Sequence, residues 1–167
     1  VNNKKVMSYL ANGGGPGVLL LHSLWGLKSA FNEMCDHIAA QGYTVLAPDM
    51  RDGQIATTID DAKALMEKSD GDFIGQVVFT AKDHLREMTK GKIGLVGFSM
   101  GAAWALIVAS ATPDQVGATV LFYGNEGVDV SKITSKVMGH FSDNYEWEPN
   151  EWVDKTFGEM KSAGVDH

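Results

Sequence analysis

Cysteine is almost absent from this chain. Cys35 is the single cysteine among 167 residues, so we expect no internal disulfide and no metal site built from several cysteines. This usage fits a reducing, cytoplasmic setting. The first fifteen residues lack a continuous apolar segment, so no signal peptide is expected. No apolar run in the sequence is long enough to span a bilayer, and no membrane partner is expected.

Positive charge is also scarce. The chain has 14 Lys and Arg residues against 21 Asp and Glu residues, which gives a formal net charge of −7. This balance argues against a basic surface for nucleic acid. Repeats, low-complexity segments and linkers are absent, so residues 1–167 are expected to form one domain. No pair of histidines has the spacing of zinc ligands with a carboxylate partner, and we expect no metal and no cofactor.

Apolar and amphipathic segments alternate along the chain. Strands are predicted at 6–11, 18–23, 43–49, 92–99, 118–124 and 135–141. Helices are predicted after a cap at Ser29, at 59–68, 72–89 and 100–111, and from Pro149 onward. In the segment 59–68 one helix face would carry Ile59, Ala62, Leu65 and Met66. This alternation predicts an α/β fold, a doubly wound and mostly parallel sheet with helices on both faces, and a ligand site beyond the carboxyl ends of the strands.

A Gly-x-Ser-x-Gly motif centred on Ser99 lies in the segment KIGLVGFSMGAAWAL, residues 92–106. The motif is short, but an apolar strand precedes it and a helix of small residues follows it, which is the context of a nucleophile elbow. Gly97 and Gly101 have no Cβ atom, so the strand, turn and helix can approach closely. Ser99 is therefore the candidate nucleophile. The alternative is a glycine-rich turn that carries an ordinary serine.

Two further strand ends offer residues for a site around such a nucleophile. The segment LLLHSLWGL, residues 19–27, leaves a buried strand at Ser23, which would line a pocket. The backbone N–H groups of Leu24 and Met100 are the candidate donors of an oxyanion hole. Trp25 would form a pocket wall or, alternatively, pack in the core. Arg51 follows the strand at 43–49 and would hold a substrate carboxylate, unless it is a surface or ion-pair residue.

These motifs together resemble those of the dienelactone hydrolase family of the α/β-hydrolase superfamily. The resemblance is carried by PGVLLLHSLWGLKSAFNEMCDHIAAQGYTVLAPDM, GKIGLVGFSMGAAWAL, ATVLFYG, VMGHFSDNYEWEP and FGEMKSAGVDH, and so covers nearly the whole chain. It implies an α/β-hydrolase-like fold and the hydrolysis of a small-molecule ester or lactone by a nucleophile, an acid and a histidine. The nucleophile would be Ser99, at a position where the best-known members of the family use cysteine.

Three positions depart from the family pattern. Ser23 stands where the family often has a glutamate, and Tyr145 stands at the position of the acid. Asp143 is the preferred replacement for that acid and Glu146 the second choice, while the alternative is that both are solvated loop carboxylates. The similarity stops at SAGVDH, where a last strand and then the histidine loop would follow, and His167 is too early to be that histidine.

We therefore expect a fold that is C-terminally truncated relative to the family, with an exposed sheet edge. Three explanations stay open: residues absent from the sequence, a homo-oligomer that covers the edge, and strand exchange between protomers. Two functions stay open as well. The first is an acyl hydrolase that forms an acyl-enzyme at Ser99. The second is a non-catalytic protein of the same fold that binds a ligand or assembles with a partner.

Overall fold

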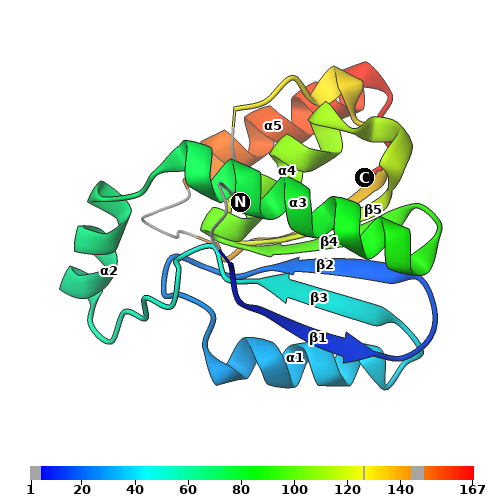
Figure 1. Cartoon of the computed structure of the whole chain (residues 1–167). Coiled ribbons are helices and arrows are strands. Elements are labelled where there is room, and N and C mark those ends of the chain that lie inside the picture. The colour runs from blue at the N-terminus through cyan, green and yellow to red at the C-terminus, as the bar shows by residue number, and fades with distance from the viewer. Residues whose placement is uncertain (1–4, 126, 144–148) are drawn as a thin grey trace.

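The computed structural model describes residues 5–125, 127–143 and 149–167. These residues form a sheet with the strand order β1-β3-β2-β4-β5-β6 (Figure 1). The strands are β1 (Ser8–Asn12), β2 (Gly17–Leu21), β3 (Thr44–Pro48), β4 (Ile93–Phe98), β5 (Val116–Phe122) and β6 (Lys136–His140). Strand β1 is antiparallel to β3, and the other neighbouring pairs are parallel. The sheet is therefore mostly parallel, as predicted.

The helices are α1 (Ser29–Ala39), α2 (Ile59–Glu67), α3 (Gly71–Thr89), α4 (Met100–Ala111) and α5 (Asn150–Ala163), with short 3-10 helices at Pro113–Gln115 and Val130–Lys132. Helix α1 covers one face of the sheet, and α3, α4 and α5 lie on the other (Figure 1). Helix α2 stands outside both layers, beyond the carboxyl ends of β2 and β3. Of the helices in the described ranges, none is long and apolar enough to cross a bilayer.

The sheet separates two apolar clusters. Successive residues of β2 point to opposite faces, so Leu19 and Leu21 belong to the larger cluster, while Leu20 belongs to the smaller one. The larger cluster includes Met160 of α5, and the smaller one includes Cys35 of α1. All five side chains are fully buried. The continuous apolar run of β2 thus reflects a parallel strand that is covered on both faces.

The predicted elements form, with ends that shift by a few residues. One predicted detail is wrong: Ser29 is not the cap of α1, because Lys28 occupies the N-cap position and no side chain caps the helix. At the other end of the sheet, the residues after α5 lie beside β6. The N–H of Val137 donates to the carbonyl of Asp166 at 2.8 Å, and Lys136 forms an ion pair with the carboxylate of Asp166 at 3.1 Å.

Aromatic rings connect the ends of three parallel strands. Phe98, Phe122 and His140 lie side by side in register on β4, β5 and β6. The ring centroids of Phe98 and Phe122 are 4.7 Å apart, and those of Phe122 and His140 are also 4.7 Å apart. Phe31 of α1 meets Phe98 edge-on at 5.4 Å. This stack holds together the sheet end from which the next loops emerge.

Candidate active site

Ser99 lies in the tight turn between β4 and α4. Its φ of 51° and ψ of −116° form a backbone conformation that residues with a side chain rarely adopt. The N–H of Ser99 donates to the carbonyl of Phe122 at 2.9 Å, and the carbonyl of Ser99 accepts from the N–H of Ala102 at 2.8 Å. Such a conformation persists only where the surrounding structure enforces it, and these two bonds supply that restraint.

Two glycines allow this turn to form. A Cβ atom on Gly97 would overlap the carbonyl oxygen of Gly101, and a Cβ atom on Gly101 would overlap the carbonyl oxygen of Leu21. Only glycine avoids these overlaps, so β4, α4 and the end of β2 can touch through their backbones. The strand–turn–helix arrangement expected around Ser99 is therefore present.

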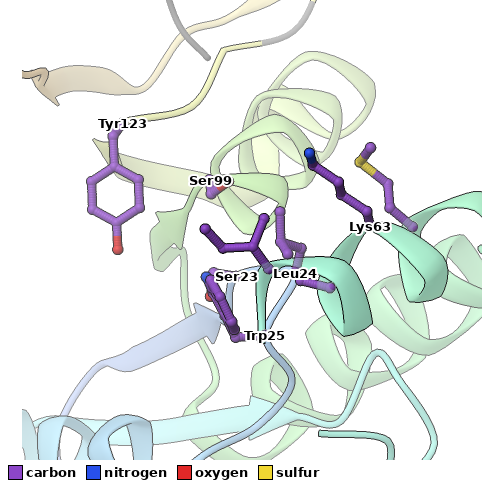
Figure 2. A pocket seen from close by; sticks show the side chains of 9 residues that line it. Ser23, Leu24, Trp25, Lys63, Ser99 and Tyr123 are labelled. Carbon is purple, nitrogen blue, oxygen red and sulfur yellow. The ribbon is translucent and has the colours of Figure 1, made fainter. Parts of the chain in front are cut away.

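A cavity of about 210 Å³ opens beside Ser99, and we call it the Ser99 cavity. It is lined by Ser23, Leu24, Trp25, Ile59, Ala62, Lys63, Met66, Ser99 and Tyr123. Figure 2 shows Tyr123 and Lys63 on opposite sides of Ser99, with Ser23 and Trp25 below it. The lining comes from the loop after β2, from α2, and from the turns after β4 and β5. These turns follow the carboxyl ends of parallel strands, where a site is expected in this type of fold.

The structure thus brings Ser23, Leu24 and Trp25 to the same cavity as Ser99. It also adds residues that sequence reasoning missed, namely Tyr123 and the lining residues of α2. Tyr123 directly follows β5 and has a positive φ of 40°, which no local sequence signal indicated. The apolar spacing along α2 was visible in the sequence, but its direction toward a cavity was not.

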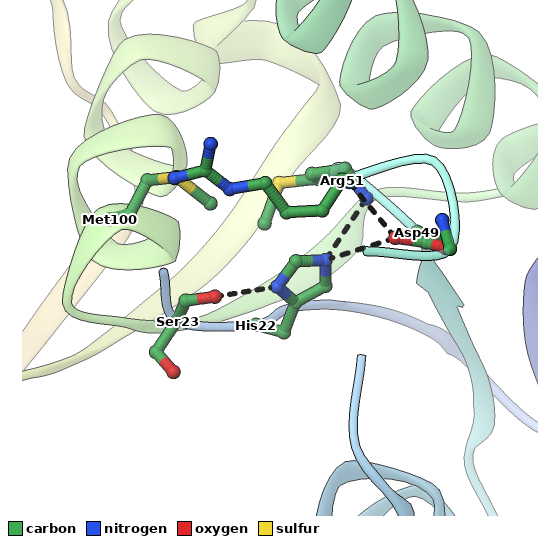
Figure 3. A network of polar contacts seen from close by, with 7 residues as sticks. His22, Ser23, Asp49, Arg51 and Met100 are labelled. Atoms are coloured by element: carbon green, nitrogen blue, oxygen red, sulfur yellow. Dashed lines mark hydrogen bonds and ion pairs between the residues drawn. The ribbon is translucent and has the colours of Figure 1, made fainter. Parts of the chain in front are cut away.

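A buried histidine holds the loop after β2 (Figure 3). His22 is fully buried, and its Nδ1 lies 2.7 Å from the carbonyl oxygen of Ser23. Its Nε2 accepts from the N–H of Met50 at 3.0 Å, so the ring proton belongs on Nδ1 and the ring is neutral. Burial lowers the pKa of His22, which favours this neutral form. Both ring nitrogens are therefore occupied in positioning the loop that carries Leu24.

The N–H groups of Leu24 and Met100 keep their donor capacity. Within the described ranges, neither group donates to a carbonyl or a side chain. Met100 is the first residue of α4, so its N–H has no partner inside the helix and lies at the positive end of the helix dipole. Leu24 lines the Ser99 cavity, and Met100 directly follows Ser99. Both groups stay candidates for binding an oxyanion.

Arg51 does not line the Ser99 cavity, although it contacts Met100, one of the other candidates. Its side chain is buried. The guanidinium donates to the carbonyl of Leu65 at 2.7 Å and to the hydroxyl of Ser69, and it contacts the sulfur of Met100 at 3.5 Å. Burial lowers the pKa of Arg51. The substrate contact that we predicted for Arg51 is not supported by this geometry, because the side chain instead joins α2 to the start of α4.

The predicted acid, Asp143, is not among the residues that line the cavity. The carboxylate of Asp143 is exposed and accepts from the side-chain amide of Asn150 at 2.8 Å. Tyr145 and Glu146 lie outside the described residues. Among the residues that the structure describes, no histidine, aspartate or glutamate lines the Ser99 cavity. In the same part of the chain, no group of three such side chains or cysteines could hold a metal ion.

Comparisons with known proteins agree with this architecture. The sequence profile of the dienelactone hydrolase family matches residues 6–167. "Protein usf" of Aquifex pyrophilus is 36% identical over 136 residues, which cover 74% of this chain and 58% of that protein. A carboxymethylenebutenolidase of Rhodococcus opacus is 28% identical over 120 residues, which cover 64% of this chain and 43% of that protein. The chain therefore spans about half the length of these curated relatives.

A solved structure, m3DLH, superimposes with a TM-score of 0.81 at 23% sequence identity. The superposition covers 99% of this chain and 75% of that structure, and it shows a shared fold. Sequence profile and fold agree over nearly the whole described chain. This chain belongs to the dienelactone hydrolase family and has the α/β-hydrolase fold.

Proposed function

We propose that this chain acts as a serine-dependent hydrolase of small-molecule esters or lactones. The observation that carries the proposal is the strained turn that places Ser99 at a cavity, next to two backbone N–H groups with no acceptor in the described ranges. Membership of the dienelactone hydrolase family supports it, as does the name of the R. opacus relative. A cytoplasmic location stays a prediction that rests on the single, buried cysteine.

In the proposed reaction, the hydroxyl oxygen of Ser99 bonds to the ester carbonyl carbon, and the carbonyl π electrons move to its oxygen. The N–H groups of Leu24 and Met100 bind that oxyanion. Collapse of the intermediate expels the alcohol, which takes up the proton that Ser99 gave to the base. Water then attacks the acyl-enzyme, releases the acid and restores Ser99.

The base in this scheme is a histidine, as the family resemblance implies, and a carboxylate such as Asp143 would orient it. His22 is unsuited to the task because both of its ring nitrogens are bonded within the loop and strand ends around it. No described histidine lines the Ser99 cavity. The proposal therefore takes the base from outside the described residues.

A second function is a non-catalytic role in which the same cavity binds a ligand. It is favoured by the neutral Tyr145 at the family's acid position and by the absence of an acid and a histidine from the described lining. Under this alternative the turn at Ser99 would help to form a binding site and would not carry out a reaction.

Labelling and turnover separate the two functions. We expect a fluorophosphonate probe to label Ser99, and we expect p-nitrophenyl acetate to be hydrolysed by the wild-type protein but not by Ser99→Ala. Ser29→Ala is the matched control, because Ser29 is exposed on α1 and takes no part in the site. Absence of both labelling and Ser99-dependent turnover would leave the binding role as the better account.

A further inference from the structure

Helix α2 has an apolar face that the core does not bury. Ile59 and Met66 are 58% and 49% exposed, while Ala62 between them is buried. These three residues, which we call the α2 apolar face, line the Ser99 cavity. An amphipathic helix normally turns its apolar side to the core. Exposed apolar side chains that gather in a concave site next to a reactive group are typical of a ligand-binding surface.

The facing wall of the cavity has the same character. Leu24 and Trp25 are partly buried and line the cavity from the loop after β2 (Figure 2). The carbonyl of Trp25 accepts from the N–H of Ala56 at 3.1 Å. This bond ties the β2 loop to the segment that leads into α2. Apolar side chains from two joined segments therefore line the cavity that contains Ser99.

Polar contacts close the first turn of α2 and join its last turn to the fold. A capping box between Thr58 and Asp61 closes its first turn. At its last turn, the carbonyl of Leu65 accepts from the buried guanidinium of Arg51, which extends to Met100 at the start of α4 (Figure 3). A cation is well placed there, at the negative end of the helix dipole. The bond between Ala56 and Trp25 before α2 and the bond between Arg51 and Leu65 at its last turn thus join the helix to the rest of the fold, and the α2 apolar face is left for a ligand.

The apolar lining of the cavity favours an uncharged group, because a charge held against apolar side chains loses its hydration. Arg51 directs its guanidinium to Leu65 and Ser69 and so does not face the cavity. Lys63 is the cationic member of the lining, and its side chain is exposed.

We propose, on the basis of the hydrolase function above, that the substrate is an uncharged carboxylic ester whose short aliphatic acyl chain lies against the α2 apolar face. The cavity of about 210 Å³ is smaller than the roughly 300–1,000 Å³ of sites for drug-sized ligands, which fits a short chain. The bound acyl chain would cover the side chains of Ile59 and Met66, which are exposed to solvent in the free protein.

The test compares p-nitrophenyl acetate with p-nitrophenyl butyrate in the wild-type protein and in the double variant Ile59→Ser with Met66→Ser. Burial of two additional methylene groups should raise kcat/KM by about tenfold from acetate to butyrate in the wild type. In the double variant the ratio should fall below about threefold. Met138→Ser is the matched control, because Met138 is 58% exposed on β6 and does not line the cavity, and it should keep the wild-type ratio.

A charged ester distinguishes an apolar site from an anion site at Lys63. The mono-p-nitrophenyl ester of succinate has an acyl part of similar length to butyrate but ends in a carboxylate. We expect it to be hydrolysed with a kcat/KM at least tenfold below that of the butyrate ester. A butyrate-to-acetate ratio near one, a ratio that the double variant does not change, or a preference for the succinate ester would each overturn the proposal.

Equilibrium binding separates a failure of this inference from a failure of the hydrolase function. Ser99→Ala cannot form the acyl-enzyme, so its dissociation constants for ethyl butyrate and ethyl acetate, measured by NMR titration, do not depend on catalysis. Tighter binding of ethyl butyrate that the double variant abolishes would support the α2 surface even if no ester is hydrolysed. Equal binding of the two esters, or binding of neither, would overturn the inference even if Ser99 is an active nucleophile.

Discussion

Ser99 has a backbone conformation that suits glycine better than serine. Its φ of 51° and ψ of −116° mirror the extended conformation, which glycine adopts in either hand with similar ease. For a residue with a Cβ atom, such a conformation costs on the order of 1–3 kcal/mol. We therefore predict that Ser99→Gly is more stable than Ser99→Ala, although both lack the hydroxyl group.

The size of the difference follows from two opposing effects. Ser99→Ala keeps the Cβ atom and hence the strain. Ser99→Gly removes the strain, but the additional freedom of the unfolded chain costs about 0.5–1 kcal/mol relative to alanine. The net difference in the free energy of unfolding should be about 0.5–2 kcal/mol in favour of glycine. For a chain of this size, each kcal/mol raises Tm by about 2–4 °C.

Urea unfolding, followed by tryptophan fluorescence and far-UV circular dichroism, measures this difference, provided that the m-values agree between variants. Ser29 gives a control of opposite sign, because it is the first residue of α1, where glycine should be less favourable than alanine by up to about 1 kcal/mol. If Ser99→Gly is no more stable than Ser99→Ala while the Ser29 pair behaves as expected, the turn at Ser99 stores no strain and the reasoning fails.

Three further changes test the surroundings of the site. Arg51→Gln should lower the free energy of unfolding by about 1–3 kcal/mol, because the Leu65 carbonyl loses a charged donor. Limited proteolysis of this variant should show faster cleavage within 52–69. An unchanged digestion pattern would contradict the role of Arg51 in holding α2. Burial lowers the pKa of His22 below its unfolded value of about 6.5, so the unfolded chain binds more protons and stability should fall as the pH drops below about 6.5. Urea titrations at pH 7.5 and 5.5 should show a smaller fall in the free energy of unfolding for His22→Gln than for the wild type. An equal fall in both proteins would assign the pH dependence to another group. Burial raises the pKa of Cys35 to about 12, so Ellman's reagent should react with it only after unfolding, and immediate reaction would contradict the packing of α1.

Features with a strong local cause could be predicted from the sequence. Helices cover both faces of a parallel sheet, so every residue of β2 is buried. Consecutive residues of β2 must therefore be apolar, and this run is visible in the sequence. The turn at Ser99 was predictable for a similar reason. Close backbone contacts near the serine and with the end of β2 require glycine at positions 97 and 101. The two glycines of the motif therefore predict the tight turn that the structure shows.

Features that depend on distant partners could not be predicted in this way. The spacing of Ile59, Ala62 and Met66 indicates one apolar helix face, but whether that face meets the core or a cavity depends on where the chain directs the helix. The position of Arg51 after a strand end predicts a substrate contact, yet its partners Leu65 and Ser69 come 14 and 18 residues later in the chain. The roles of Asp143, Leu24 and Met100 in catalysis stay predictions.

The hydrogen bond from the N–H of Ser99 to the carbonyl of Phe122 also determines when, during synthesis of the chain, the turn at Ser99 can form. Phe122 ends β5, so a growing chain that has already emerged past the Gly-x-Ser-x-Gly motif still lacks the partner that fixes Ser99. Strand β4 must in addition pair with β2, which was made much earlier, and such long-range parallel pairing is slow. A nascent chain should therefore be unreactive toward acyl compounds until β5 has joined the sheet, however early its serine leaves the ribosome.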